Sequence, residues 1–295
     1  MGKELYSNSK HAKEVFDLVD QSLSFSLSEL MFQGPADELE KTVNSQPAIM
    51  TTSLASLAAF EEYRSERQFP LLALAGHSLG EYTSLVAAGV VDLATGVGLV
   101  RERGRLMQEA ADHRAGGMAA IIGLDLITLD EICGETGVEI ANVNSDSQTV
   151  ISGERIALAR AMDLASARGA RKTIPLAVAG AFHSQLMAPA QKGLGLALAK
   201  TIFSEPKAPI VANMTGKKLN TALEVKAELE QQLCSCVQWK NSVNCMIDMG
   251  VSTFMEFGAT QVLTSLVKKI NRQVKVVNIV DVASAKKVVE QGTML

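Results

Sequence analysis

A serine, Ser78, lies between two glycines in the segment Gly76-His77-Ser78-Leu79-Gly80. This G-x-S-x-G spacing is typical of a nucleophile elbow, a sharp turn that exposes a serine hydroxyl between a strand and a helix. Glycine on either side would let the chain turn without Cβ clashes. The apolar run at 71–75 predicts a strand buried on both faces, and 79–88 predicts a helix. The alternative is a serine that only caps that helix.

A nucleophilic serine needs a base, and histidine is the usual one. The sequence has four histidines. We expect His11 and His113 to be exposed because their segments are polar, and strand alternation should aim His77 away from Ser78. His183 follows a predicted strand and a glycine, where a loop would cross a strand end, and is the candidate base. The alternative is a structural histidine with satisfied hydrogen bonds.

The helix predicted over 92–111 carries a third candidate, Arg103. Its neighbours at helical spacing are apolar: Leu99, Val100, Leu106 and Met107. The equivalent neighbours of Arg105 are charged or polar, so Arg105 should face solvent. A core-facing arginine is costly unless it meets an anion. Arg103 could therefore clamp a substrate carboxylate, pair with a protein carboxylate, or extend its charge to water.

Length and composition restrict the class of protein. The 295 residues, 47% hydrophobic, are enough for one large domain and a smaller one. The net charge is −4 and the basic residues are scattered, which argues against a nucleic-acid surface. Four cysteines without C-x-x-C indicate neither zinc nor disulfides. No apolar run approaches the roughly 18 residues of a membrane span and the start lacks a signal-peptide core, so we expect a cytoplasmic protein.

Alternating helical and strand patterns predict an α/β fold. Residues 8–66 are mostly helical in pattern, with one helix opening at 46–49 and Pro47 near its first turn. The order over 118–178 is βαββαβ, which is typical of a ferredoxin-like unit. Its predicted strands are 118–123, 138–143, 148–152 and 171–178, and its helices are 126–133 and 154–167. Further on we predict helices at 184–201 and about 225–233, and strands at 209–213, 253–257 and 274–279.

The order of the chemical groups along the chain is also informative. An α/β-hydrolase would place its acid and then its histidine late in the chain. Here no histidine follows His183. The elbow therefore resembles the turn of that fold without its chain order.

Taken together, the motifs closely resemble malonyl-CoA:acyl-carrier-protein transacylases, the discrete acyltransferases of type II fatty-acid synthesis. The matching segments follow the order of that family over essentially all of the chain. They are GHSLGEY around Ser78, RGRLMQEA around Arg103, AGGMAAIIGL at 115–124, AFHSQLM around His183, SQPAIMT around Gln46 and QLCSCVQW up to Trp239. The resemblance implies an α/β-hydrolase-like large domain of residues 1–114 and 181–295, with an inserted ferredoxin-like domain at 115–180.

The resemblance also implies a mechanism. Ser78 would attack the malonyl thioester while His183 takes its proton, CoA would leave, and Arg103 would hold the free carboxylate of the malonyl-serine. The phosphopantetheine thiol of acyl carrier protein would then accept the malonyl group. Further implied roles are the Leu79 N–H as an oxyanion donor, the Gln232 main-chain carbonyl as the group that orients the histidine, Gln46 as a pocket residue, and Phe182 as a barrier to an α-methyl branch. No cofactor or metal is implied, the implied partners are malonyl-CoA and acyl carrier protein, and we expect a monomer.

The sequence departs from the family pattern in three places. Relatives begin with a strand and a G-Q-G-S-Q turn, whose first glutamine supplies a second oxyanion N–H, before the segment that here starts MGKELY. We therefore expect slow transfer, and a gain in kcat of about two orders of magnitude when such a turn is added. The chain also has Gly258-Ala259-Thr260 in place of G-P-G, and Cys236 in place of a proline.

Two alternative functions stay open on the sequence alone. One is a thioesterase or acyl hydrolase that uses the same serine and histidine. The other is a weakly active homologue that binds the carrier protein. Whether water or carrier protein takes the acyl group distinguishes the hydrolase from the transferase.

Overall fold

Helices form the N-terminal part of the chain. The structure is a computed structural model and describes residues 1–64 and 70–291. The N-terminal helices are α1 Lys3–Asn8, α2 Lys10–Leu23, α3 Leu27–Gln33, α4 Ala36–Glu40 and α5 Thr42–Arg64. The helical prediction for 8–66 is confirmed up to Arg64, and its last two residues lie outside the described residues.

The predicted start of α5 is wrong. We expected a helix to open at 46–49, but α5 begins at Thr42 and Pro47 lies inside it. The backbone N–H groups of Asn44 and Ser45 donate to the Lys41 carbonyl at 2.9 and 2.8 Å, which starts the helix one turn earlier. Pro47 therefore lies past the first turn, where it removes the donor for the Val43 carbonyl and sets its ring against that carbonyl.

The elbow connects β1 (Leu74–Ala75) to α6 (Leu79–Ala87). Ser78 has φ 51° and ψ −105°, a conformation that non-glycine residues rarely adopt. A Cβ atom on Gly76 would lie 2.0 Å from the carbonyl carbon of Gly80, whereas a Cβ on Gly80 would meet nothing within 4 Å. The interpretation that both glycines relieve clashes is therefore wrong for Gly80. Only Gly76 is needed for close approach.

The strand before the elbow is shorter than predicted. We expected 71–75 to be buried on both faces, yet Leu71 and Leu72 are 57% and 43% exposed. β1 pairs in parallel with β6 (Ile210–Val211), and its first paired residue is Leu74. The two leucines thus precede the sheet and are not covered by it.

Most of the remaining elements of the larger part were predicted to within a few residues. β6 also pairs with the short antiparallel strand β7 (Lys218–Leu219), and β8 (Thr253–Phe257) pairs in parallel with β9 (Lys275–Ile279). The helices are α7 Leu93–His113, α10 Ala188–Lys200, α11 Ala222–Gln231, α12 Trp239–Asp248, α13 Val262–Ile270 and α14 Val282–Gln291, with short 3₁₀ turns η1 Gln185–Met187 and η2 Gln232–Cys234. We did not predict β7, α12, α13 or α14. The mixed α/β class is confirmed.

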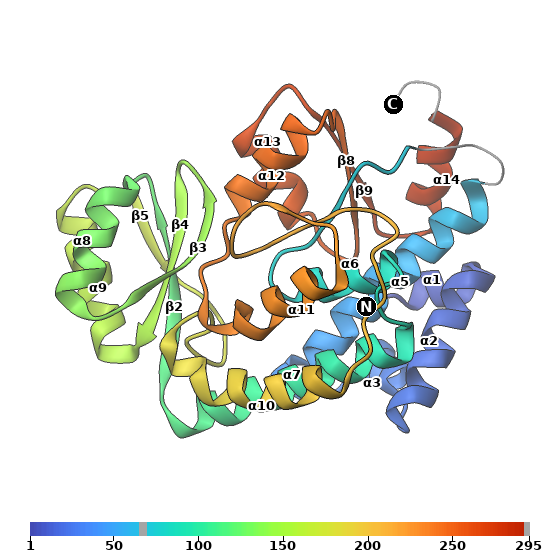
Figure 1. Ribbon diagram of the computed structural model, residues 1–295, viewed down its shortest axis with the longest axis horizontal. Helices are drawn as coiled ribbons and strands as arrows, with labels where there is room; N and C mark the ends of the chain where they lie inside the picture. Colours follow the sequence, from blue (N-terminus) through green and yellow to red (C-terminus); the bar gives the residue numbers. More distant parts are fainter. Residues whose placement is uncertain (65–69, 292–295) are drawn as a thin grey trace.

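The middle of the chain forms a separate four-stranded antiparallel sheet, on the left in Figure 1. In chain order its elements are β2 Gly116–Ile122, α8 Leu126–Thr136, β3 Glu139–Ser145, β4 Gln148–Glu154, α9 Arg155–Ala167 and β5 Lys172–Pro175. The βαββαβ order is confirmed, and the strands lie in the order β3-β4-β2-β5. The division into domains at 115 and 180 stays a prediction.

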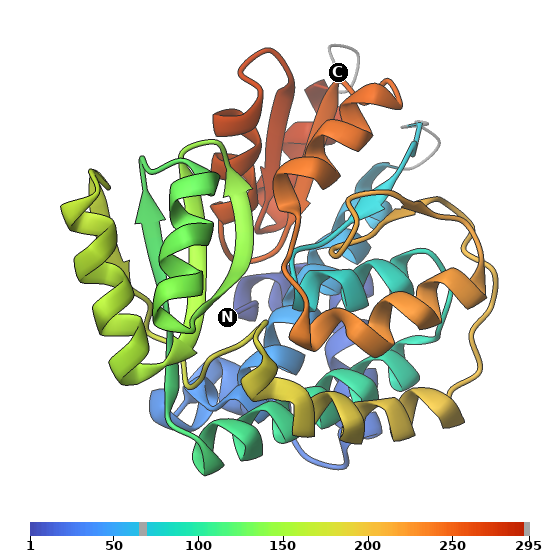
Figure 2. The same cartoon turned by 60° about the vertical axis from the view of Figure 1, so that its left-hand side comes forward.

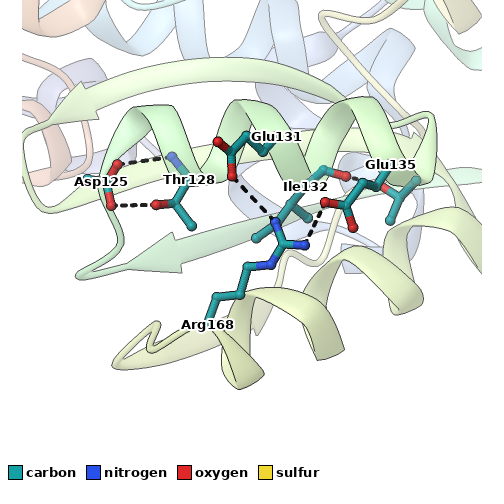
Figure 3. A network of polar contacts seen from close by, with 7 residues as sticks. Asp125, Thr128, Glu131, Ile132, Glu135 and Arg168 are labelled. Carbon is teal, nitrogen blue, oxygen red and sulfur yellow. Dashed lines mark hydrogen bonds and ion pairs between the residues drawn. The ribbon is translucent and has the colours of Figure 1, made fainter.

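The two helices of this unit pack on one face of the sheet, and in Figure 2 this helical face is turned toward the viewer. Figure 3 shows polar contacts within α8 and the ion pairs of Arg168 that link α8 to the end of α9. Arg168, just after α9, donates to Glu135 of α8 at 2.6 Å, and Asp125 caps α8 by accepting from the Thr128 N–H at 3.0 Å. The other face of the sheet is turned toward Phe182. That residue directly precedes His183, so the sheet forms one wall next to the candidate base.

None of the helices in the described part of the chain is long and apolar enough to cross a membrane.

The unequal surroundings of the two elbow glycines lead to a stability prediction. Gly76→Ala should lower the free energy of unfolding by about 1–3 kcal/mol, because its Cβ would overlap the Gly80 backbone. Gly80→Ala, the matched control, should leave stability unchanged or raise it by up to about 1 kcal/mol, because alanine favours the helix. Urea unfolding of the two variants measures the difference. Equal stabilities would contradict this account of the turn.

Candidate active site

Ser78 and His183 meet although they are 105 residues apart. The Ser78 Oγ atom lies 2.7 Å from Nε2 of His183. Ser78 occupies the N-cap position of α6, but its side chain makes no capping hydrogen bond. The alternative of a plain helix cap is therefore wrong: the hydroxyl is turned to the histidine instead.

The hydrogen bonds of His183 define which nitrogen carries the proton. Its Nδ1 atom lies 3.1 Å from the main-chain carbonyl oxygens of both Gln232 and Ser235. Carbonyl oxygens only accept, so Nδ1 must carry the hydrogen and Nε2 has the free lone pair. The Ser78 hydroxyl can then donate to Nε2. This is the arrangement that a general base needs, with carbonyls in the place where many such sites have a carboxylate.

The surroundings of His183 favour its neutral form. The residue is 4% exposed. Burial, and then the nearby charge of Arg103, lower the pKa of the imidazole to about 3. At neutral pH the Nε2 lone pair is therefore available to receive a proton.

Arg103 lies beside the serine and is buried, as its apolar neighbours predicted. It is 1% exposed, so it does not extend to water. One terminal nitrogen donates to Gln46 Oε1 at 2.7 Å, and the other donates to Ser78 Oγ at 2.9 Å and to Gln232 Oε1 at 3.2 Å. All three acceptors are neutral, and the Nε atom has no hydrogen-bond partner among the described residues.

The charge of Arg103 is only partly balanced within the protein. No carboxylate among the described residues comes within ion-pair distance of it. Among the carboxyl groups, Glu81 has the strongest electrostatic effect on Arg103. Burial, and then the charge of Glu228, raise the pKa of Glu81 to about 8, while the hydrogen bonds from Asn213 and Gln232 act in the opposite direction. A buried cation next to a nucleophile and without an ion pair suits an anionic substrate group.

Three further predicted site residues lie around this centre. Gln46 and Gln232 both contact Arg103 directly through their side-chain oxygens. Leu79 is the first residue of α6, so its N–H has no acceptor within the helix and points out of the helix end next to Ser78. Phe182 is half-buried and packs between the core of the large part and the face of the small sheet.

The other histidines are placed as predicted. His11 and His113 are exposed. His77 turns away from Ser78, and its Nε2 lies 2.9 Å from Oδ1 of Asn144 in β3. Arg105 also faces solvent, where it pairs with Glu102 and Glu109.

Three residues of the site were missed by the sequence analysis. Ser235 supplies the second carbonyl acceptor for His183. Asn213 accepts from the Ser78 N–H in the elbow, and Glu81 accepts from the Asn213 N–H. One signal pointed to Asn213: it is a polar residue at the end of a predicted strand, at the edge of a sheet where functional residues gather. Nothing local distinguished Ser235.

A cleft of about 450 Å³ opens beside His183. Its lining comes from α8 and the start of β3, from His183, and from η2 and the residues after it. The lining residues are Asp130, Cys133, Gly134, Val138, Glu139, Ile140, His183, Cys234 and Cys236. All four cysteines of the chain are free thiols. Burial raises the pKa of Cys234 and of Cys236 to about 11, so these two thiols are poor nucleophiles at neutral pH. No cluster of metal-ligating side chains occurs in the described ranges.

Comparison with known proteins agrees with this geometry. Residues 1–291 match the acyl transferase domain family. The chain belongs to this acyl transferase family. A malonyl CoA-acyl carrier protein transacylase from Bacillus subtilis strain 168 is 42% identical over 286 residues, which cover 95% of this chain and 89% of that protein. The corresponding protein of Staphylococcus aureus strain MRSA252 is 37% identical over 284 residues, covering 95% and 90%.

Solved structures of acyl transferases share the whole architecture. The malonyl CoA-acyl carrier protein transacylase of Coxiella burnetii superposes with a TM-score of 0.94 at 33% identity, over 99% of this chain and 92% of that one. A malonyl-transacylase solved in complex with its holo acyl carrier protein, from a type II polyketide synthase, also has a TM-score of 0.94. It is 37% identical, and the match covers 99% of this chain and 94% of that chain.

The protonation of His183 can be measured directly. We expect nitrogen NMR to show a neutral ring with its hydrogen on Nδ1 from pH 8 down to pH 5, whereas the same histidine in a urea-unfolded sample titrates near pH 6.5. Since the unfolded chain takes up this proton and the folded chain does not, His183 should reduce stability as the pH falls from 6.5 toward 3. The limit is about 1.4 kcal/mol per pH unit. An imidazolium signal from folded protein at pH 6 would contradict this.

Proposed function

We propose that this chain transfers a malonyl group from malonyl-CoA to the phosphopantetheine thiol of acyl carrier protein, as the names of its relatives suggest. One observation favours an acyl group that bears a free carboxylate. Arg103 is buried, has no ion-pair partner in the described parts of the chain, and donates to Ser78 Oγ at 2.9 Å. A malonyl group bound to Ser78 would bring its free carboxylate next to this guanidinium, which is well shaped for bidentate contact.

In the first half of the proposed reaction the Ser78 oxygen attacks the thioester carbon. Its hydroxyl proton passes to Nε2 of His183, which lies 2.7 Å away. The Leu79 N–H is placed to donate to the oxyanion that forms. CoA then leaves with the proton from His183, and malonyl-Ser78 remains.

In the second half the carrier thiol takes the place of CoA. His183 removes the proton from the phosphopantetheine thiol, the thiolate attacks the malonyl ester, and Ser78 recovers its proton. We place the incoming arm in the cleft that His183 lines. The reaction as proposed needs no cofactor. Gln46 and Gln232 hold Arg103, and Phe182 restricts the space beside His183.

A hydrolase with the same serine and histidine is the second candidate. The first half-reaction would be the same, but water would release the acyl group. The malonyl-transacylase from the type II polyketide synthase was solved in complex with its acyl carrier protein, and this similarity favours transfer to a carrier over hydrolysis.

The role of Ser78 can be tested by intact mass. Wild-type protein incubated with malonyl-CoA should gain one malonyl group, and addition of holo carrier protein should remove it to the carrier. Ser78→Ala should give no adduct because no other hydroxyl lies at the elbow. A normal adduct in that variant would disprove the mechanism, and release of free malonate instead of malonyl-carrier would favour the hydrolase.

The role of Arg103 can be tested by comparing two substrates. Arg103→Ala should reduce kcat/KM for malonyl-CoA by roughly 30- to 1,000-fold, the equivalent of losing about 2–4 kcal/mol of charge-assisted contact. Acetyl-CoA has no carboxylate and should lose far less. Steady-state kinetics with both substrates measures this. Equal losses would mean that Arg103 is only structural.

A further inference from the structure

The side chain of Glu81 links three parts of the site without touching the reacting atoms. It is completely buried in the first turn of α6. Its Oε1 accepts from the backbone N–H of Asn213 at 2.9 Å, and its Oε2 accepts from the side-chain amide of Gln232. These partners are 132 and 151 residues further along the chain. Both partners donate N–H groups, so the side chain at position 81 must accept a hydrogen bond through each of its two terminal atoms.

Asn213 connects Glu81 to the elbow. The residue is completely buried just after β6. Its side-chain nitrogen donates to the Gly76 carbonyl at 2.7 Å, and its side-chain oxygen accepts from the Ser78 N–H at 2.6 Å. One amide therefore binds the backbone on both sides of the turn. Ser78 has φ 51°, and a strained conformation of this kind persists only when its surroundings hold it.

Gln232 connects Glu81 to Arg103 and to His183. Its Nε2 also donates to the Ser78 carbonyl at 3.0 Å, and its Oε1 accepts from Arg103 at 3.2 Å. Its main-chain carbonyl lies 3.1 Å from Nδ1 of His183. A rotation of this side chain would disturb the arginine and the elbow together, and a shift of its backbone would release the histidine.

We propose that Glu81 is a positioning residue of the acyl-transfer site, which holds Asn213 and Gln232 so that Ser78, Arg103 and His183 keep their relative places. The inference rests on the proposed function for its substrate, whereas the hydrogen bonds of Glu81 are the same whichever substrate the site takes. Misplacement of reacting groups by about 1 Å can cost on the order of 100-fold in rate.

A second buried acid offers a matched control. Glu228 is 5% exposed, and its Oε1 accepts from the backbone N–H of Met214 at 2.7 Å, next to Asn213. It thus binds the adjacent amide of the same segment. If Glu81 only balanced buried charge or supported the fold, Glu81→Gln and Glu228→Gln would have similar effects.

The experiment measures the reactivity of Ser78 with and without a thioester substrate. A fluorophosphonate reagent tests the nucleophile alone: the Ser78 oxygen bonds phosphorus, fluoride leaves, and the hydroxyl proton passes to His183. Malonyl-CoA and acetyl-CoA then test acyl transfer. We expect Glu81→Gln to slow phosphonylation by at least about 10-fold and to reduce kcat for both substrates by roughly 10- to 100-fold, with KM changed less than about three-fold. Glu228→Gln keeps both hydrogen bonds of Glu81, so it should be slowed clearly less than Glu81→Gln in every assay.

The proposal is overturned if Glu81→Gln reacts within three-fold of wild type, or if Glu228→Gln is slowed as much. If Glu81→Gln does not fold, as judged by urea unfolding, Gln232→Met tests the same link, since it keeps the main-chain carbonyl but removes the amide that Glu81 holds. It should slow phosphonylation to a similar degree, and an unchanged rate would overturn the proposal. If wild type forms no malonyl adduct while phosphonylation still separates the two glutamate variants, the proposed function fails and the positioning role stands.

Discussion

The burial of one positive charge organises the site. Arg103 projects from the middle of α7 into the core with 1% of its surface exposed, where an unsatisfied guanidinium would be costly. Its partners are side-chain oxygens from α5, the elbow and η2. Since these acceptors are neutral, they satisfy hydrogen bonds without cancelling the charge. The three segments must therefore converge on α7, and their convergence brings Ser78 to the place where an acidic acyl group could be held.

The second demand on the fold is backbone strain. Ser78 and His183 are two of the three non-glycine residues with positive φ in the described parts of the chain, at 51° and 58°. Strained residues of this kind persist when the surrounding contacts over-determine them. Here the contacts are identifiable: Asn213 binds the elbow backbone, and the carbonyls of Gln232 and Ser235 hold the histidine ring. The dyad is thus maintained by hydrogen bonds to main chain and amides, with no carboxylate on the histidine.

The fold was predictable where the signal is local. The βαββαβ order of the small sheet was correct because each of its strands and helices shows its own period and ends at turn residues. The errors lie where tertiary contacts override local pattern. Leu71 and Leu72 look like buried strand but precede the first paired residue of β1, and α5 starts upstream of Pro47. The helices α12, α13 and α14 were missed entirely.

For the site, the sequence by itself determined the residue types and part of their local geometry: a serine in a turn that begins at a glycine, and an arginine in the apolar stripe of a helix. The histidine was expected directly after a strand, but β5 ends at Pro175, eight residues before His183. The first two features depend on periodicity and turn chemistry, which act over a few residues. Only the tertiary structure decided that Arg103 has no carboxylate partner within residues 1–64 and 70–291, and that Ser235 contacts the histidine ring. It also decided that Asn213 binds the elbow and that Glu81 binds Asn213. Such contacts join residues from about 50 to more than 130 positions apart, so they exist only once the helices and strands have packed.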